Sequence, residues 1–187
     1  MALTESTMML NLNADAPDFA LPDVASGRIV RRDDFRGKAG LLVMFICTHC
    51  PYVKHVEKEL AAIGQDYAGK PLGIVAISSN DALMYPDDSP EGLKKQAQRL
   101  GFCFPYLYDE TQQVARAYKA ACTPDFYLFN RDLKLVYRGE LDRSRPGNNV
   151  PVNGEDLRGA IDAVLAGKPV SADQRPSIGC NIKWKRN

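Results

Sequence analysis

The chain has 187 residues, of which 45% are hydrophobic and 25% charged, as expected for one soluble domain. Its net charge of +1 gives no reason to expect nucleic acid or an acidic membrane as a partner. No apolar run reaches the roughly 18 residues of a membrane span. The first residues have neither the basic start nor the apolar core of a signal peptide. We therefore expect a cytoplasmic protein, in which thiols are kept reduced.

The first half of the chain predicts a hairpin and then a strand–helix–strand unit. Residues 16–36 contain two short strand-like segments around a Ser26-Gly27 turn. The apolar run 40–46 is typical of a strand that is buried on both faces. An amphipathic helix with Pro51 near its start follows, and residues 72–78 predict a second buried strand.

The second half continues the alternation of helices and strands. We expect, in chain order, a helix that begins at Ser89 and ends at Gly101, a strand in 104–108, a helix in 110–120, a hairpin over 125–139 and a last helix capped by Asn153. Strands joined by helices imply a parallel section, and the hairpin adds antiparallel strands. The sequence therefore predicts a three-layer α/β domain over 1–187 with a mixed central sheet, and a tail, 168–187, that docks on the body.

Two cysteines in the segment "CTHCPYVKH", Cys47 and Cys50, are the main chemical signal of the sequence. Such a pair can bind a metal, reduce a peroxide or exchange disulfides. A zinc site needs four ligands, but there is no second Cys-x-x-Cys, and the only histidines are His49 and His55. An odd total of five cysteines also fits poorly with a fully paired disulfide framework. We therefore predict redox chemistry and no metal.

A Cys-x-x-Cys between a buried strand and a helix resembles the thioredoxin superfamily. The segment "CTPDFYLF" strengthens the resemblance, because Pro124 stands where these proteins carry a cis-proline. The segments "NADAPDFALPDV", "DDFRGKAGLLVMF" and "CTHCPYV" resemble the AhpC/TSA (redoxin) branch. The combination of "CTHCPYVKH", "ISSNDALMYPDDSPE", "CTPDFYLF", "LDRSRPGNN" and "SIGCNIKWK" resembles a group of bacterial thioredoxin-like, peroxiredoxin-like proteins. The resemblance implies a thioredoxin-like fold with an N-terminal β-hairpin extension.

This resemblance implies roles for the residues of the Cys47-Thr48-His49-Cys50 motif. Cys47 is expected to be the nucleophile and to stand in the first turn of the helix, with a pKa lowered by the helix terminus and by His49. Cys50, expected to be more buried, would be the resolving thiol. Thr123 and Pro124 would form the substrate platform, because a residue before a cis-proline exposes its backbone to an extended peptide.

The other cysteines and one loop leave alternatives open. Cys122 and Cys180 are either further redox thiols or packed side chains, and Cys103 is expected in the core. The loop residues Asn80, Asp81, Tyr85, Asp87 and Asp88 line a substrate cleft, bind a hard cation or are simply solvated.

Departures from the thioredoxin pattern weaken the prediction of a general protein reductase but not that of thiol-disulfide chemistry, and a thiol peroxidase is the runner-up. Leu41 replaces the buried acid that usually accepts the proton of the resolving thiol, so water, His49 or Tyr52 would have to serve. In the peroxidase alternative, Cys50 followed by Pro51 is the peroxide-reactive thiol. Arg143 or Arg145 would then activate the peroxide, but Cys47 replaces the usual threonine.

We therefore expect a thiol-disulfide oxidoreductase of cell redox homeostasis, with a protein or small-molecule disulfide or thiol as substrate. It would have no tightly bound cofactor and would receive electrons from an external thiol system. The chain would be a monomer or homodimer. A third alternative is a non-catalytic thioredoxin-fold interaction module.

Overall fold

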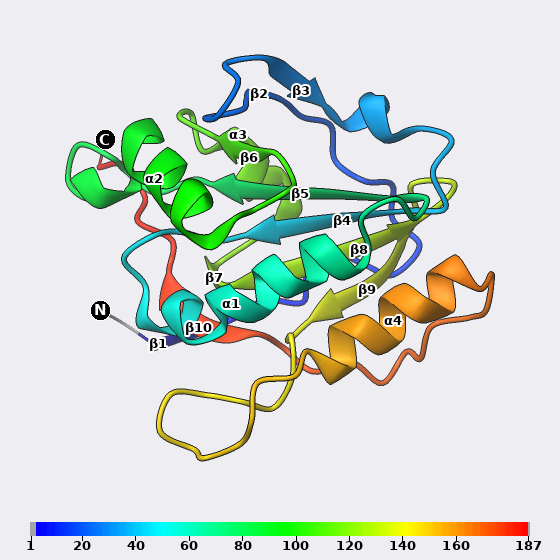
Figure 1. The fold of residues 1–187 in the computed structure, drawn as a ribbon. Coiled ribbons are helices and arrows are strands. Elements are labelled where there is room, and N and C mark those ends of the chain that lie inside the picture. The colour runs from blue at the N-terminus through cyan, green and yellow to red at the C-terminus, as the bar shows by residue number, and fades with distance from the viewer. Residues whose placement is uncertain (1–2, 187) are drawn as a thin grey trace.

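The central sheet of the computed structural model, which describes residues 3–186, has five strands (Figure 1). In spatial order they are β6 (Tyr106–Tyr108), β5 (Leu72–Ser78), β4 (Gly40–Phe45), β8 (Asp125–Asn130) and β9 (Leu135–Gly139). Strands β4, β5 and β6 run parallel, whereas β8 is antiparallel to both β4 and β9. The sheet is mixed, as predicted.

Helices cover both faces of this sheet. They are α1 (Pro51–Asp66), α2 (Pro90–Leu100), α3 (Gln113–Tyr118) and α4 (Glu155–Leu165), with single 3₁₀ turns η1 (Arg32–Phe35) and η2 (Pro86–Asp88). Helix α2 begins as predicted, since the Ser89 hydroxyl accepts a hydrogen bond from the Gly92 amide at 3.3 Å. It ends at Gly101, whose φ of 67° only glycine adopts freely. Helix α3 is shorter than predicted because left-handed residues flank it at Gln112 and Lys119.

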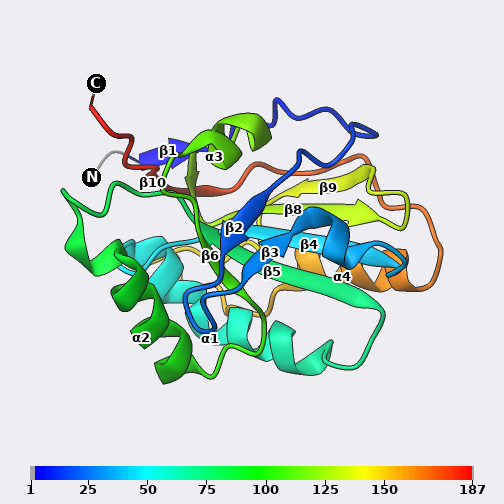
Figure 2. The same cartoon turned by 90° about the horizontal axis from the view of Figure 1, so that it is seen from above.

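The alternation of side chains along β4 separates two cores. Leu42 and Met44 belong to the core that includes α1 and α4, whereas Val43 and Phe45 belong to the core that includes α3 and the N-terminal segment. In Figure 2, α1 and α4 lie on one side of the sheet and α3 on the other. This is the predicted three-layer arrangement.

The N-terminal extension is a hairpin of β2 (Ala20–Pro22) and β3 (Ile29–Arg31). Asp23 closes its turn by accepting a hydrogen bond from the Ser26 hydroxyl at 2.6 Å. The other oxygen of Asp23 accepts from the Tyr106 amide at 3.1 Å. The hairpin is thereby joined to the edge of the sheet at β6, as Figure 2 shows.

The end of the chain forms a small second sheet that the sequence did not predict. Strand β10 (Ile178–Asn181) lies between β1 (Leu3–Glu5) and β7 (Cys122–Thr123), antiparallel to both. It also packs against α1 (Figure 1). Beyond β10, Ile182 is 1% exposed and the Trp184 ring lies 4.5 Å from the Arg116 guanidinium. The tail is therefore seated at the end of the sheet where α1 begins.

Two sequence predictions are wrong in detail. Cys103, expected in the core, is exposed, because the flanking rings of Phe102 and Phe104 stack on each other at 4.7 Å and take the inward positions. The last helix begins at Glu155 after Gly154, rather than directly after Asn153, although the Asn153 side chain still accepts from the Glu155 amide at 3.1 Å. Within residues 3–186, no helix has the length and apolar character needed to cross a membrane.

Candidate active site

The two cysteines of the motif lie in the short connection between β4 and α1. Both are completely buried, so Cys50 is not the more buried of the two. Helix α1 begins at Pro51, which makes Cys50 the N-cap residue and leaves Cys47 three residues before the N-cap, outside the helix. The prediction that Cys47 stands in the first helical turn is therefore wrong. The cause is Pro51, which favours the first helical position.

Thr123 contacts both sulfur atoms. Its hydroxyl lies 3.3 Å from the Cys47 sulfur, and its carbonyl oxygen lies 3.3 Å from the Cys50 sulfur. The Thr123-Pro124 peptide bond is cis. The loop before β8 thus holds the two thiols on one side, opposite the start of α1.

The two thiols differ in acidity, and the order is the reverse of the predicted one. A hydrogen bond from the Cys47 thiol lowers the pKa of Cys50 to about 5, helped by the Cys180 thiol and the Val53 amide and opposed by burial. Burial raises the pKa of Cys47, and negative charge on Cys50 and Asp88 raises it further. A protonated Cys50 can donate to the Thr123 carbonyl, but the hydrogen bonds to its sulfur from Cys47, Cys180 and Val53 outweigh this one acceptor. These shifts place negative charge on Cys50 in preference to Cys47.

A buried carboxylate orders the residues between the two cysteines. One oxygen of Asp88 accepts from the Thr48 amide at 2.8 Å and the Thr48 hydroxyl at 2.6 Å. The other lies 2.5 Å from His49 Nδ1 and 2.7 Å from the Asn80 amide nitrogen. Burial raises the pKa of Asp88, but these hydrogen bonds outweigh it, so the pKa lies below its ordinary value. Tyr85 stacks on the His49 ring with centroids 5.1 Å apart.

The sequence placed Asp88 among the residues of a possible cleft, but it predicted no role for this side chain beside the thiols. The loop from Asn80 to Asp88 does line the site, but its neighbouring acids have different environments: Asp87 is exposed and Asp88 is fully buried. The only sequence signal was two acids after a proline, and no spacing rule distinguishes them.

Three potential metal ligands also meet at this point. Among the described residues, the Cys47 sulfur, a His49 nitrogen and an Asp88 oxygen lie within 4.8 Å of one another. This donor set suits zinc, but a structural zinc site takes four ligands and the Asp88 oxygens already accept four hydrogen bonds. The absence of a resident metal remains a prediction.

The two further candidate thiols have different surroundings. Cys180 is 5% exposed, and its thiol hydrogen-bonds the Cys50 sulfur. Cys122 is fully buried, and its sulfur lies 3.7 Å from the Pro124 carbonyl oxygen and 3.9 Å from that of Ser177. Burial, and then the charge of Asp125, raises the pKa of Cys122 far above its ordinary value. Cys180 thus contacts the redox pair, whereas Cys122 is a packed thiol.

The predicted substrate platform is already occupied by the chain itself. Thr123 is only 3% exposed, because β10 pairs with β7 and sets Cys180 opposite Thr123. The expectation that Thr123 exposes its backbone to an incoming peptide is therefore wrong for this conformation. A peptide can reach Thr123 only after β10 has moved.

The arginines considered for peroxide activation have other contacts. Arg145 hydrogen-bonds the Glu140 carboxylate and also donates to the carbonyl oxygens of Asp142 at 2.6 Å and Ser144 at 2.7 Å. The Arg143 side chain is 52% exposed. Arg145 is therefore bound within its own loop.

A second buried acid directly follows the cis-proline. Asp125 accepts hydrogen bonds from the Tyr127 and Ser6 hydroxyls, both at 3.0 Å. Burial raises its pKa to about 7 in spite of these donors. Leu41, at the place where thioredoxins have their buried acid, is completely buried in the apolar core.

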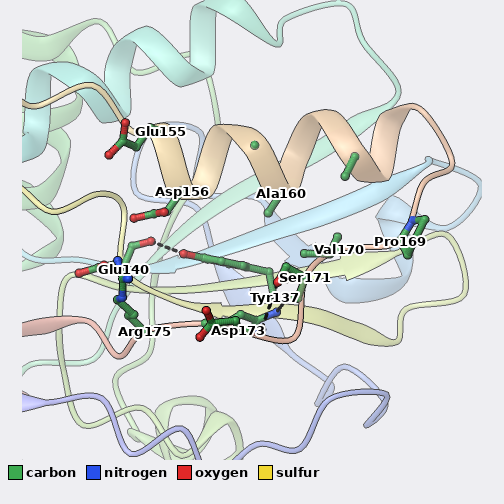
Figure 3. A pocket seen from close by; sticks show the side chains of 13 residues that line it. Tyr137, Glu140, Glu155, Asp156, Ala160, Pro169, Val170, Ser171, Asp173 and Arg175 are labelled. Carbon is green, nitrogen blue, oxygen red and sulfur yellow. Dashed lines mark hydrogen bonds between the residues drawn. The ribbon is translucent and has the colours of Figure 1, made fainter.

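A cleft of about 460 Å³, drawn in Figure 3, has no cysteine among its lining residues. It is lined by β9, α4 and the tail segment 169–175, and within it the Tyr137 hydroxyl donates to the Glu140 carbonyl oxygen at 2.6 Å. The tail crosses this cleft on its way to β10. The cleft is therefore a separate feature.

Comparison with known proteins places the chain in a family. Residues 12–138 match the model of the AhpC/TSA family. The chain is 30% identical over 135 residues, 71% of its length and 70% of the relative's, to "Thiol-disulfide oxidoreductase ResA" of Geobacillus thermodenitrificans (strain NG80-2).

Two solved structures cover nearly the whole chain. An uncharacterized conserved protein from Geobacillus kaustophilus is 58% identical with a TM-score of 0.97, covering 100% of this chain and 98% of that one. A hypothetical protein from Sinorhizobium meliloti 1021 is 47% identical with a TM-score of 0.95, and the match covers 98% of this chain and 100% of that one. A putative thiol:disulfide interchange protein DsbE from Chlorobium tepidum is 23% identical with a TM-score of 0.66, and the match covers 83% of this chain and 99% of that one. At this identity the similarity supports a shared fold only. The chain belongs to the AhpC/TSA family and has a thioredoxin-like fold.

Proposed function

We propose that this protein is a thiol-disulfide oxidoreductase whose redox pair is Cys47 and Cys50. The observation that carries the proposal is a pair of buried sulfurs that both contact Thr123, next to the cis Thr123-Pro124 bond. The name of the ResA relative supports the same reaction class. A depressed thiol pKa matters because the thiolate is the nucleophile of disulfide exchange.

The acidities assign the first attack to Cys50, which reverses the order predicted from the sequence. The Cys50 thiolate attacks one sulfur of a substrate disulfide, and the other substrate sulfur leaves as a thiolate. Cys47 then gives up its proton and attacks the Cys50 sulfur, which breaks the mixed disulfide and releases the second thiol. His49, ordered by Asp88 beside Cys47, is the proposed proton acceptor.

An external thiol system would reduce the Cys47–Cys50 disulfide, and the reaction needs no tightly bound cofactor. The substrate class is a protein or small-molecule disulfide or thiol. The cytoplasmic location and the monomeric or homodimeric state also belong to the proposal.

Trapping the mixed disulfide tests both the reaction and the order of attack. Cys47→Ser and Cys50→Ser variants, each combined with Cys180→Ser so that the neighbouring Cys180 thiol cannot displace glutathione from Cys50, are incubated with oxidised glutathione at pH 7 and analysed by mass spectrometry. We expect a stable glutathione adduct on Cys50 in Cys47→Ser and no adduct on Cys47 in Cys50→Ser. Cys103→Ser, which changes an exposed thiol outside the site, is the matched control. The opposite pattern restores Cys47 as the nucleophile, and no adduct in either variant refutes the proposed function.

A thiol peroxidase is the second candidate, favoured by the low pKa of Cys50 and by Pro51 directly after it. The Arg145 contacts within its own loop and the replacement of a threonine by Cys47 speak against it. A peroxide pulse in the presence of dimedone separates the two functions. A peroxidase forms the trapped sulfenic acid on Cys50 within seconds, whereas an oxidoreductase reacts no faster than free cysteine. An interaction module would instead keep its partners when both cysteines are serine.

A further inference from the structure

Strand β10 lies where an extended substrate would pair with the enzyme. It runs antiparallel to β7 and places Cys180 opposite Thr123, the residue before the cis-proline. Addition of a strand to an exposed backbone edge is a general mode of peptide recognition. The chain therefore presents its own strand, with a cysteine in it, to its own redox pair.

The residue before Cys180 is fitted closely to this position. A Cβ atom on Gly179 would lie 1.9 Å from the Thr123 carbonyl oxygen and 3.2 Å from the Pro124 nitrogen. Only glycine allows this approach, because real side chains do not come so close to backbone atoms. The backbone of Gly179 thus packs directly against Thr123 and Pro124, and this contact places the sulfur of Cys180 beside Cys50.

The residues after β10 hold the strand in place. The Asn80 side chain accepts from the Lys183 amide at 2.8 Å. The Gln112 side chain donates to the Lys183 carbonyl oxygen and accepts from the Lys185 amide, both at 2.8 Å. Asn80 also donates to Asp88, so one hydrogen-bond network joins the tail to the acid that orders His49.

We propose that Cys180 is a third redox thiol that acts as an internal substrate of the Cys47–Cys50 pair. When the pair is oxidised, the Cys180 sulfur attacks the Cys50 sulfur and a Cys50–Cys180 bond forms. The Cys47–Cys50 bond breaks, and Cys47 leaves with the bonding electron pair and takes the proton of Cys180. No net oxidation occurs. The step rests on the proposed function, because a substrate disulfide must first oxidise the pair.

The pKa of Cys180 depends on whether the Cys47–Cys50 pair is reduced or oxidised. Burial raises the pKa of Cys180 to about 12. The hydrogen bond with Cys50 and the negative charge on the Cys50 sulfur contribute to that rise. A disulfide at Cys50 carries no charge, so the last two causes disappear when the pair is oxidised. The new disulfide would tie the tail to the start of α1 and keep the platform closed, with Cys47 returned to a free thiol.

Peptide mapping detects this disulfide directly. Trypsin leaves Cys47 and Cys50 together in peptide 39–54 and Cys180 in peptide 159–183, since Lys168 and Arg175 precede prolines. Wild type is reduced, treated with one equivalent of oxidised glutathione, quenched with acid, alkylated and digested. We expect the crosslink between peptides 39–54 and 159–183 in wild type and in the Cys103→Ser control. In Cys180→Ser only the disulfide inside peptide 39–54 should form.

Two glycine variants test whether the strand delivers Cys180. Gly179→Ala should lower the yield of the crosslink at least fivefold, because its methyl group forces β10 off Thr123. Gly159→Ala, at a helical position with no atom near the new Cβ, should leave the yield unchanged. Circular dichroism verifies that both variants fold, and if Gly179→Ala does not, the Cys180→Ser comparison decides alone.

The outcomes separate this inference from the proposed function. A wild type that forms and recycles the Cys47–Cys50 disulfide while Cys180 remains fully alkylated overturns the role of Cys180 alone. A wild type in which neither disulfide forms overturns the proposed function and this inference together.

Discussion

Replacing Asp88 with asparagine tests the electrostatics of the site. Asp88→Asn keeps the size of the side chain but removes its negative charge. An Asp88 oxygen and the Cys47 sulfur lie within 4.8 Å of each other, and this carboxylate is one cause of the raised pKa of Cys47. The substitution should therefore make Cys47 more acidic.

The size of the effect follows from Coulomb's law. Two unit charges 4.8 Å apart repel by about 3.5 kcal/mol at an effective dielectric constant of about 20. At 1.36 kcal/mol per pKa unit this corresponds to roughly 2.5 units before screening. The asparagine oxygen keeps part of the dipole and salt screens the rest, so we expect the pKa of Cys47 to fall by roughly one to two units.

The pH dependence of alkylation measures this shift. A Cys50→Ser background leaves Cys47 as the only thiol in peptide 39–54, and its labelling by iodoacetamide is followed by mass spectrometry between pH 6 and pH 11. Asp87→Asn, which removes an exposed neighbouring charge, is the matched control and should not move the midpoint. A folded Asp88→Asn protein with the same midpoint as its control would refute the electrostatic coupling.

Three further changes test other parts of the structure. Asp125 has a folded pKa of about 7, above its ordinary value of 3.8, so its contribution to stability is complete below pH 4 and is lost as the pH rises through 7. Asp125→Asn should remove this pH dependence and raise the free energy of unfolding at pH 8, measured by urea titration, by about 4 kcal/mol. Equal stability of the wild type at pH 5 and pH 8 would contradict the raised pKa of Asp125. Gln112→Ala removes two hydrogen bonds to the tail, worth about 1 kcal/mol each, and should speed alkylation of the buried pair by about 30-fold, whereas the exposed Gln113→Ala should not. Leu60→Ala, at a fully buried position of α1, should cost about 2–5 kcal/mol of unfolding free energy without changing the mixed-disulfide pattern, and a cost below 1 kcal/mol would show that α1 is not packed as described.

The amino-acid sequence by itself determined the order of the main elements and the position of the redox motif. Local chemistry explains this: β4 is a continuous apolar run, Ser89 caps α2, and Gly101 ends it with a positive φ. The pattern of Cys50 and Pro51 likewise placed the thiols between a buried strand and a helix. These features depend on neighbours in the chain, which a sequence displays directly.

Only the tertiary structure decided which sulfur carries the charge and what covers it. The acidity of Cys50 depends on a thiol from β10, and that of Cys47 on a carboxylate from the loop before α2. Asp87 and Asp88 are identical in kind and adjacent, yet one is solvated and the other accepts four hydrogen bonds. Burial and charge act through space, so residues distant in the chain set the chemistry of the site.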